Sequence, residues 1–88
     1  MKYRIPETTL LQDVADEMVL LNPESGQYYT LDAVGARMIT LLRDLDDEAT
    51  VVEALVTEYE VDEARVTKDL RALLEQMAGQ GLVEAVAD

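Results

Sequence analysis

The sequence contains no cysteine, histidine, tryptophan or phenylalanine, and Ser25 is its only serine. Without cysteine there is no disulfide bond and no thiolate to act as nucleophile or metal ligand. Without histidine the chain lacks the usual acid–base group at neutral pH and the commonest metal ligand. Nucleophilic triads and zinc sites are thereby almost ruled out, so we expect no catalytic residue, no metal and no cofactor.

Positive charge is scarce as well. Seven lysines and arginines face 19 aspartates and glutamates, which gives a formal net charge of −12. Affinity for nucleic acid depends mainly on neutralising phosphates with Lys and Arg, and anionic lipids attract basic segments. We therefore expect neither nucleic acid nor a membrane to be a partner of so acidic a chain.

Long hydrophobic runs are missing too. The longest is Met18–Leu21, whereas a membrane-spanning helix needs about 20 apolar residues. No apolar run of about 7–15 residues follows the basic residues at the N-terminus, so a secretory signal is not expected either. The sequence therefore predicts a cytoplasmic protein.

What is present suffices for a small fold. Leu, Val and Ile account for 25 of the 88 residues. That share is above the level of roughly 20% below which a highly charged chain is typically disordered. A chain of this length has room for one hydrophobic core, so we expect residues 1–88 to form a single domain.

Three β-compatible runs come first along the chain, at residues 8–14, 17–22 and 27–31. A turn separates the last two runs, because Pro23 fixes φ near −65° and Gly26 can adopt a positive φ. The last two runs are therefore predicted to form a β-hairpin.

Helical spacing of apolar residues begins after Asp32, whose carboxylate is well suited to cap a first turn. Gly35 lies inside this predicted helix, where glycine costs about 1 kcal/mol relative to alanine. Either Gly35 is simply a small residue or the helix packs closely on a neighbour, and we favour close packing.

Two further helices are predicted. Thr50 and Glu53 have the spacing of a capping box, in which each side chain bonds the other residue's backbone N–H. Asp62 is expected to cap the third helix, which ends where Gly79 or Gly81 supplies the stop.

Strands followed by helices indicate an α+β fold, here a winged-helix-like domain with a three-stranded antiparallel sheet packed on three helices. In the strand at 27–31, Tyr29 and Leu31 share one face and Tyr28 shares the other face with Thr30. Residues 82–86 are either a last short strand or an apolar tail that closes the core.

Such a sheet leaves edge strands with unpaired N–H and C=O groups. An edge beside a helix with apolar side chains is a ready site for an extended peptide. The one concentration of positive charge, at Arg65, Lys68 and Arg71, is predicted opposite the apolar stripe of the third helix. It is either a solvated face with local pairs such as Arg71–Glu75 or, less favoured, a surface for an acidic peptide.

Three stretches of the chain together resemble the PqqD-like family. They are residues 20–37 (LLNPESGQYYTLDAVGAR), 66–74 (VTKDLRALL) and 81–83 (GLV). This family comprises the RiPP recognition elements, which bind leader peptides of ribosomally made and modified peptides. The length and the start Arg4-Ile5-Pro6-Glu7 are most similar to the freestanding leader-binding proteins of lasso-peptide pathways.

The resemblance implies a function without catalysis. The domain would capture a precursor by its leader and present it to a processing enzyme, such as the leader peptidase of lasso pathways. The leader would add an antiparallel strand to the third strand, in a cleft closed by the third helix. The residues implied are those of the strand and of one helix face: Gln27, Tyr28, Tyr29, Thr30, Leu31, Val66, Asp69, Leu70 and Leu73.

Two alternatives remain open from the sequence. One is a PqqD-type peptide chaperone that partners a radical enzyme. The other is a winged-helix module for protein interaction or regulation, although the net charge of −12 argues against binding to DNA.

Overall fold

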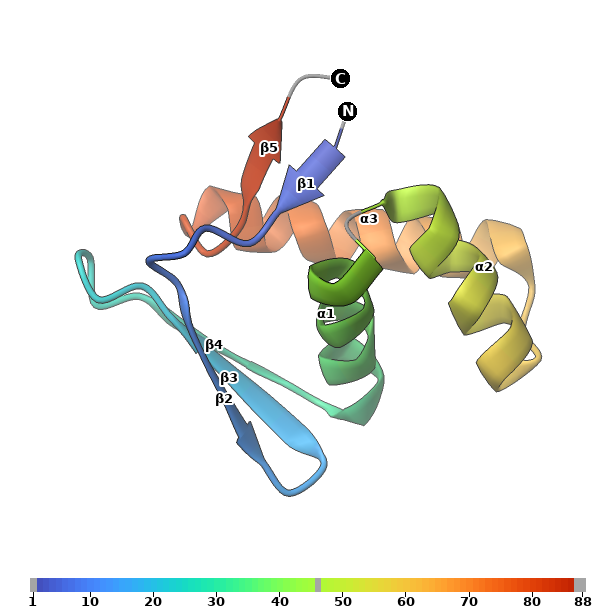
Figure 1. The fold of residues 1–88 in the computed structure, drawn as a ribbon, viewed down its shortest axis with the longest axis horizontal. Coiled ribbons are helices and arrows are strands. Elements are labelled where there is room, and N and C mark those ends of the chain that lie inside the picture. The colour runs from blue at the N-terminus through green and yellow to red at the C-terminus, as the bar shows by residue number, and fades with distance from the viewer. Residues whose placement is uncertain (1, 46, 87–88) are drawn as a thin grey trace.

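A computed structural model describes residues 2–45 and 47–86 of the chain (Figure 1). The helices and strands follow one another in the order β1 (Lys2–Arg4), β2 (Leu10–Val14), β3 (Glu17–Leu21), β4 (Tyr28–Leu31), α1 (Ala33–Leu45), α2 (Glu48–Tyr59), α3 (Glu63–Gly79) and β5 (Glu84–Val86). The predicted α+β class, with three helices and a three-stranded antiparallel sheet, is confirmed.

The three-stranded sheet has the order β2-β3-β4, so β3 is its central strand. Leu20 of β3 lies opposite Leu11 of β2 and Tyr29 of β4. Because side chains alternate between the two faces of a strand, Met18 and Leu31 share the face of Leu20, and all three are buried. This face of the sheet meets α1, which packs against both β3 and β4.

The loop between β3 and β4 contains the predicted turn. Gly26 has a φ of 76°, the positive value expected from its position. Its N–H donates to the C=O of Asn22 at 2.8 Å, and the N–H of Asn22 donates to the C=O of Gln27 at 2.8 Å. These two bonds close the hairpin one residue before β4 begins.

The start of α1 is as predicted. The Asp32 carboxylate accepts a hydrogen bond from the N–H of Gly35 at 2.9 Å. Close packing at Gly35 is also confirmed, because a Cβ atom there would lie 3.2 Å from Cδ2 of Leu31.

The predicted start of α2 is wrong. The helix begins at Glu48, and its N-cap is Asp47, whose Oδ2 accepts from the N–H of Thr50 at 3.1 Å. Thr50 is therefore inside the first turn and cannot form a capping box with Glu53. Asp47 and Thr50 are both residue types that cap helices, and Asp47, which comes earlier in the chain, supplies the cap.

The end of α3 is set by Gly81 rather than Gly79, which is the last helical residue. Gly81 has a φ of 73°. The N–H of Leu82 donates to the C=O of Met77 at 3.0 Å, and the N–H of Gly81 donates to that of Ala78 at 3.1 Å. This pair of bonds around a left-handed glycine is a Schellman motif.

The two ends of the described chain lie side by side (Figure 1). β1 pairs antiparallel with β5, with Tyr3 opposite Ala85. The sequence did not predict β1, because three residues with two charges give no local β signal. Leu82 and Val83 are buried just before β5, so the C-terminal segment both closes the core and ends in a strand.

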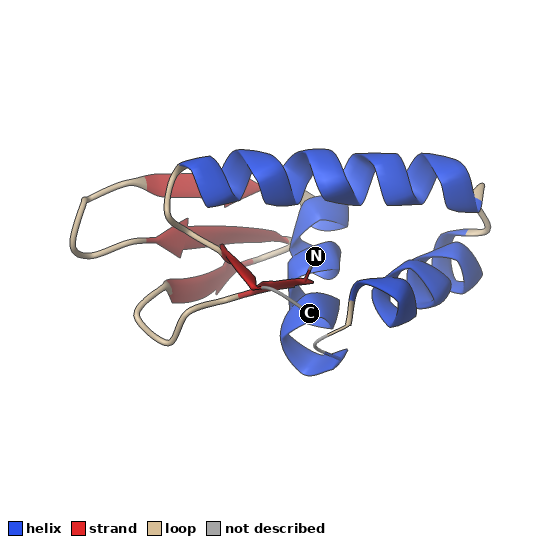
Figure 2. Cartoon of the chain, turned by 90° about the horizontal axis from the view of Figure 1, so that it is seen from above, coloured by secondary structure: helices blue, strands red, loops and turns tan. Residues whose placement is uncertain are grey.

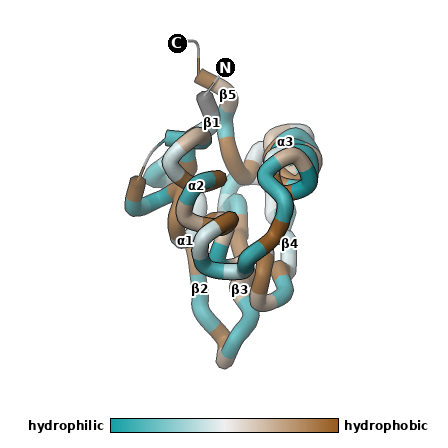
Figure 3. Tube along the Cα trace, turned by 90° about the vertical axis from the view of Figure 1, so that its right-hand side faces the viewer, coloured by the Kyte–Doolittle hydropathy of each residue, from teal (hydrophilic) through white to brown (hydrophobic). Residues whose placement is uncertain are grey.

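The helices form a layer beside the sheet (Figure 2). α1 packs on the sheet and on α2, and α2 packs on α3. The buried residues of α3, Val66, Leu70, Leu74 and Met77, recur every three or four positions and so share one face, as in an amphipathic helix. Figure 3 shows that much of the rest of this helix is hydrophilic. Among the described residues, no helix combines the length and hydropathy that a membrane crossing requires.

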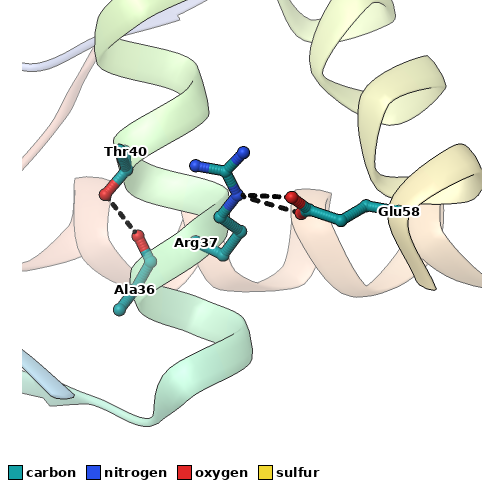
Figure 4. Close-up of polar contacts among 4 residues, drawn as sticks. All are labelled: Ala36, Arg37, Thr40 and Glu58. Atoms are coloured by element: carbon teal, nitrogen blue, oxygen red, sulfur yellow. Dashed lines mark hydrogen bonds and ion pairs between the residues drawn. The ribbon is translucent and has the colours of Figure 1, made fainter. Parts of the chain in front are cut away.

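One exposed ion pair joins α1 to α2. Nε of Arg37 donates to both carboxylate oxygens of Glu58, at 3.0 and 2.9 Å (Figure 4). The hydrogen bond to Glu58 raises the pKa of Arg37 above its usual value, so this guanidinium stays charged. One turn further along α1, the Thr40 hydroxyl donates to the C=O of Ala36 at 2.9 Å.

Candidate functional site

The ladder between β3 and β4 fixes which backbone groups of β4 are used. Asn22 and Gln27 are a hydrogen-bonded pair at the end of this ladder. Opposed residues in an antiparallel ladder alternate between hydrogen-bonded and non-hydrogen-bonded pairs. Tyr29 and Leu31, two and four residues after Gln27, therefore direct their N–H and C=O groups toward β3.

The residues in between have the opposite orientation. Tyr28 and Thr30 direct their N–H and C=O groups to the other side of β4, where no described strand pairs with it. Both side chains are exposed. This side of β4, which we call the open edge, offers two donors and two acceptors at a spacing that fits an extended peptide.

A groove of about 400 Å³ lies between β4, the start of α1 and α3. We call it the β4–α3 groove, and its lining residues are Tyr29, Thr30, Leu31, Asp32, Val34, Gly35, Met38, Asp69 and Leu73. Asp69 and Leu73 are four residues apart, so they lie one above the other on the same face of α3. The groove thus combines apolar side chains with two exposed carboxylates, those of Asp32 and Asp69.

A second hollow, of about 280 Å³, adjoins this groove among the three helices. We call it the helix pocket. It shares Val34, Met38 and Asp69 with the groove. Its other lining residues are Leu55, Tyr59, Val61, Arg65 and Val66, most of which are apolar. Together the two hollows form one path from the open edge to the far end of the helix layer.

Most of the site residues expected on the helix side line this path. Asp69 and Leu73 line the β4–α3 groove, and Val66 lines the helix pocket. Leu70 has 0% exposed surface and lies in the core, so the structure does not bring it to this path, and its part in binding stays a prediction. Leu70 and Leu73 are three residues apart, so their side chains point in different directions around the axis of α3. Leu70 points into the core, whereas Leu73 lines the groove.

The expected strand residues divide into two groups. Tyr29, Thr30 and Leu31 line the β4–α3 groove. Gln27 precedes β4, and its C=O is already bonded to Asn22. The Tyr28 side chain is 66% exposed and lies on the opposite face of the sheet, so only its backbone faces the open edge.

The sequence reasoning missed the contribution of α1. The groove is also lined by three residues at the start of α1, where this helix meets β4: Val34, Gly35 and Met38. The signal was available in part, because the close packing favoured at Gly35 is what brings the start of α1 against Leu31. Nothing in the local pattern distinguished Val34 and Met38 from ordinary core residues.

The two arginines of α3 are engaged in ion pairs at the surface. Arg71 pairs with Glu48 at 3.0 Å, and not with Glu75 as the sequence predicted. Nε of Arg65 lies 4.0 Å from Oδ2 of Asp69. Such pairs contribute little to stability, so they indicate the solvated face that the sequence favoured. The shallow hollow beside them, about 850 Å³, mixes basic and acidic side chains and has no dominant sign.

Among the residues that the structure covers, no three His, Cys, Asp or Glu side chains are grouped so that they could hold a metal ion. Fold and groove define a class: a small α+β domain in which an open edge of the sheet, at β4, lies beside a groove walled by a helix.

The chain belongs to the PqqD family. The family model described as coenzyme PQQ synthesis protein D (PqqD) matches residues 17–83. The family consists of binding domains without catalysis and includes the RiPP recognition elements, so the expectation that the chain is not an enzyme is confirmed.

Two solved structures resemble the whole chain. The first is TbiB1 in complex with the TbiA(beta) leader peptide, with a TM-score of 0.88 and 38% sequence identity. That match covers 97% of this chain and 99% of the other. The second is lasso peptide synthetase B1 complexed with the leader peptide, with a TM-score of 0.84, 27% identity and coverage of 97% and 100%. None of the curated proteins compared with the chain matches it.

Proposed function

We propose that this chain binds the leader of a ribosomally made precursor peptide as an added antiparallel strand on β4. The observation that carries the proposal is the open edge at Tyr28 and Thr30, which lies beside a groove lined by both apolar and polar side chains. The two similar proteins, both solved with a leader peptide bound, support it. We further propose that residues 1–88 act as one domain in the cytoplasm, without nucleic acid or membrane as partner.

The direction of the bound peptide follows from the ladder. A strand antiparallel to β4 has its C-terminal end near Tyr28 and its N-terminal end near Leu31. Residues that precede the strand then pass over Val34 and Met38 into the helix pocket. Backbone bonds at the open edge set the register, and the apolar hollows select for apolar side chains at alternate positions.

The expected affinity is moderate. A leader that is disordered when free loses conformational entropy when it becomes a strand, which offsets part of the contact energy. Dissociation constants in the range from about 1 nM to about 1 μM correspond to binding free energies near −12 to −8 kcal/mol. The short strand and the small hollows place this chain toward the weaker end of that range.

Direct binding is the first test. We would label a synthetic leader peptide of the precursor encoded beside this chain's gene and measure its fluorescence polarisation with increasing protein. The TbiA(beta) leader peptide serves as a second probe and a scrambled leader as the control. Saturable binding of the first peptide, absent for the scrambled one, is expected. If both leaders behave like the scrambled peptide, the proposal is wrong.

A Thr30→Pro variant tests the strand register. Proline removes the N–H that points to the open edge, and proline is tolerated on edge strands where this group faces solvent. We expect leader affinity to fall about tenfold or more, because one intermolecular hydrogen bond and its geometry are lost.

The matched control is Thr30→Val, which keeps the N–H and has a similar shape. We expect Thr30→Val to bind the leader as the unmodified chain does, and circular dichroism should show both variants folded. Equal affinities of the two variants would contradict the proposed register.

We propose that the bound precursor is presented to the leader peptidase of a lasso-peptide pathway. Similarity to lasso peptide synthetase B1 over nearly the full chain favours this partner over a radical enzyme. Presentation would act by raising the effective concentration of the precursor at the enzyme. The chain should therefore accelerate cleavage of its full precursor by that peptidase, and it should not accelerate cleavage of a precursor without the leader.

A further inference from the structure

α3 faces β4, but the two elements make little direct contact with each other. β4 packs chiefly against β3 and α1, whereas α3 packs chiefly against α2. In Figure 2, α3 is a long helix that runs past the sheet along one side of the molecule. The β4–α3 groove occupies the interval between them, with Tyr29 on one wall and Leu73 on the other.

One side-chain hydrogen bond spans this interval in the described residues. The Tyr29 hydroxyl donates to Oε1 of Gln76 at 2.9 Å. The ring of Tyr29 is partly buried against the core, so the hydroxyl reaches α3 from the core face of the sheet. Gln76 follows Leu73 by three residues, on the same side of α3.

A second contact holds the same end of α3. Nδ2 of Asn22, in the loop that leads into β4, donates to the C=O of Gly81 at 3.3 Å. The approach is close, because a Cβ atom at position 81 would lie 3.1 Å from that nitrogen. The end of the groove near Tyr29 is therefore tied to α3 through Gln76 and to the turn after α3 through Gly81, while the end near the helix pocket has no such hydrogen bond in the described residues.

We propose that Tyr29 and Gln76 are a positioning pair that sets the width of the leader-binding groove. The inference rests on the proposed function. The bond between them fixes the distance from β4 to α3 at the residue between Tyr28 and Thr30, whose backbone groups receive the peptide. With the bond in place, Asp69 and Leu73 form the groove wall that faces the added strand. Without it, this end of α3 moves away, and the peptide loses contact with one wall.

The pair is exposed, so water can replace the lost bond at little cost to the fold. This makes the proposal testable by variants that fold. Tyr29→Phe removes the hydroxyl and keeps the ring, and Gln76→Leu removes the acceptor. Gln76→Glu is the conservative variant, because a carboxylate oxygen still accepts from the tyrosine. Tyr3→Phe is the matched control, since it removes the hydroxyl of another partly buried tyrosine, in β1, that lines neither hollow.

The measurement is the affinity of each variant for the leader that binds the unmodified chain, with thermal unfolding recorded for each. We expect Tyr29→Phe and Gln76→Leu each to weaken binding about three- to tenfold, and the double variant to be no weaker than either alone. Gln76→Glu and Tyr3→Phe should bind as the unmodified chain does. Non-additive loss with little change in the unfolding temperature is the signature of positioning, which a merely structural role would not produce.

Three outcomes would overturn the inference. Unchanged affinity of Tyr29→Phe would show that the bond does not set the groove. Tighter binding would show that the bond must break to admit the peptide. Additive losses would show that the two side chains act separately. Failure of the unmodified chain to bind any leader would instead overturn the proposed function, so the two failures are distinguishable.

Discussion

At the scale of single residues, two leucines of α3 show how a small rotation separates stability from binding. Leu70 is fully buried, with 0% exposed surface, whereas Leu73 is partly buried and lines the β4–α3 groove. Truncating a buried leucine removes its transfer free energy and leaves a cavity. Truncating a leucine at the wall of a groove removes mainly the surface that a ligand would contact.

Alanine variants of these two leucines should therefore affect different properties, stability for Leu70→Ala and leader binding for Leu73→Ala. Leu70→Ala is expected to lower the free energy of unfolding by about 2–5 kcal/mol. Leu73→Ala is expected to cost less stability and to weaken leader binding more than any loss of folded protein explains. Urea unfolding and fluorescence polarisation measure the two effects. A larger loss of stability in Leu73→Ala than in Leu70→Ala would contradict the placement of these side chains.

At the scale of elements, the helix starts illustrate how the same residue type can cap or not cap. Asp47 and Asp62 both occupy N-cap positions with extended backbone. The Asp47 side chain accepts from the N–H of Thr50, whereas that of Asp62 makes no cap hydrogen bond. A cap position therefore does not by itself guarantee the bond that stabilises the helix.

Two variants with the same change in charge measure this difference. Asp47→Ala should lower stability by about 1 kcal/mol, because it leaves an N–H of the first turn of α2 without its cap. For a domain of this size such a loss lowers the melting temperature by about 4–8 °C. Asp62→Ala should have a smaller effect. Equal shifts in melting temperature would show that the capping bond of Asp47 contributes nothing beyond its charge.

At the scale of the whole molecule, the dominant physical fact is the net charge of −12 on a small domain. Like charges on a compact surface repel one another and oppose folding. The ion pairs seen here are mostly exposed and offset this repulsion only slightly. Most of the electrostatic contribution to stability is therefore repulsive.

Salt should accordingly stabilise the fold. Raising sodium chloride from about 10 mM to about 150 mM shortens the Debye length from about 30 to about 8 Å. We expect the melting temperature to rise over this interval, and potassium chloride to give the same rise. A melting temperature that falls with salt would mean that attractive pairs outweigh repulsion, contrary to this account.

Much of the fold could be predicted because it is encoded locally. The hairpin follows from Pro23 and Gly26 between two β-compatible runs, and the start of α1 follows from Asp32. The pairing of β1 with β5 could not be predicted in this way. It joins Arg4 to Glu84, and no local pattern specifies a partner that distant along the chain.

The candidate site was predictable in part for the same reason. The period of a strand places Tyr29 and Leu31 on one face, and the period of a helix aligns Asp69 with Leu73. Whether a given apolar side chain lines a groove or fills the core depends on how far α3 stands from β4. That separation is a property of packing, which is why the sequence did not distinguish buried Leu70 from Leu73 and missed Met38.

The amino-acid sequence by itself determined that this is a small acidic α+β domain without the residues for catalysis, because composition and period are local quantities. Only the tertiary structure decided which side chains line the groove beside the open edge of β4 and how wide that groove is. Those features depend on the distance between elements that are far apart in the chain, which the packing of the core and the Tyr29–Gln76 bond set together.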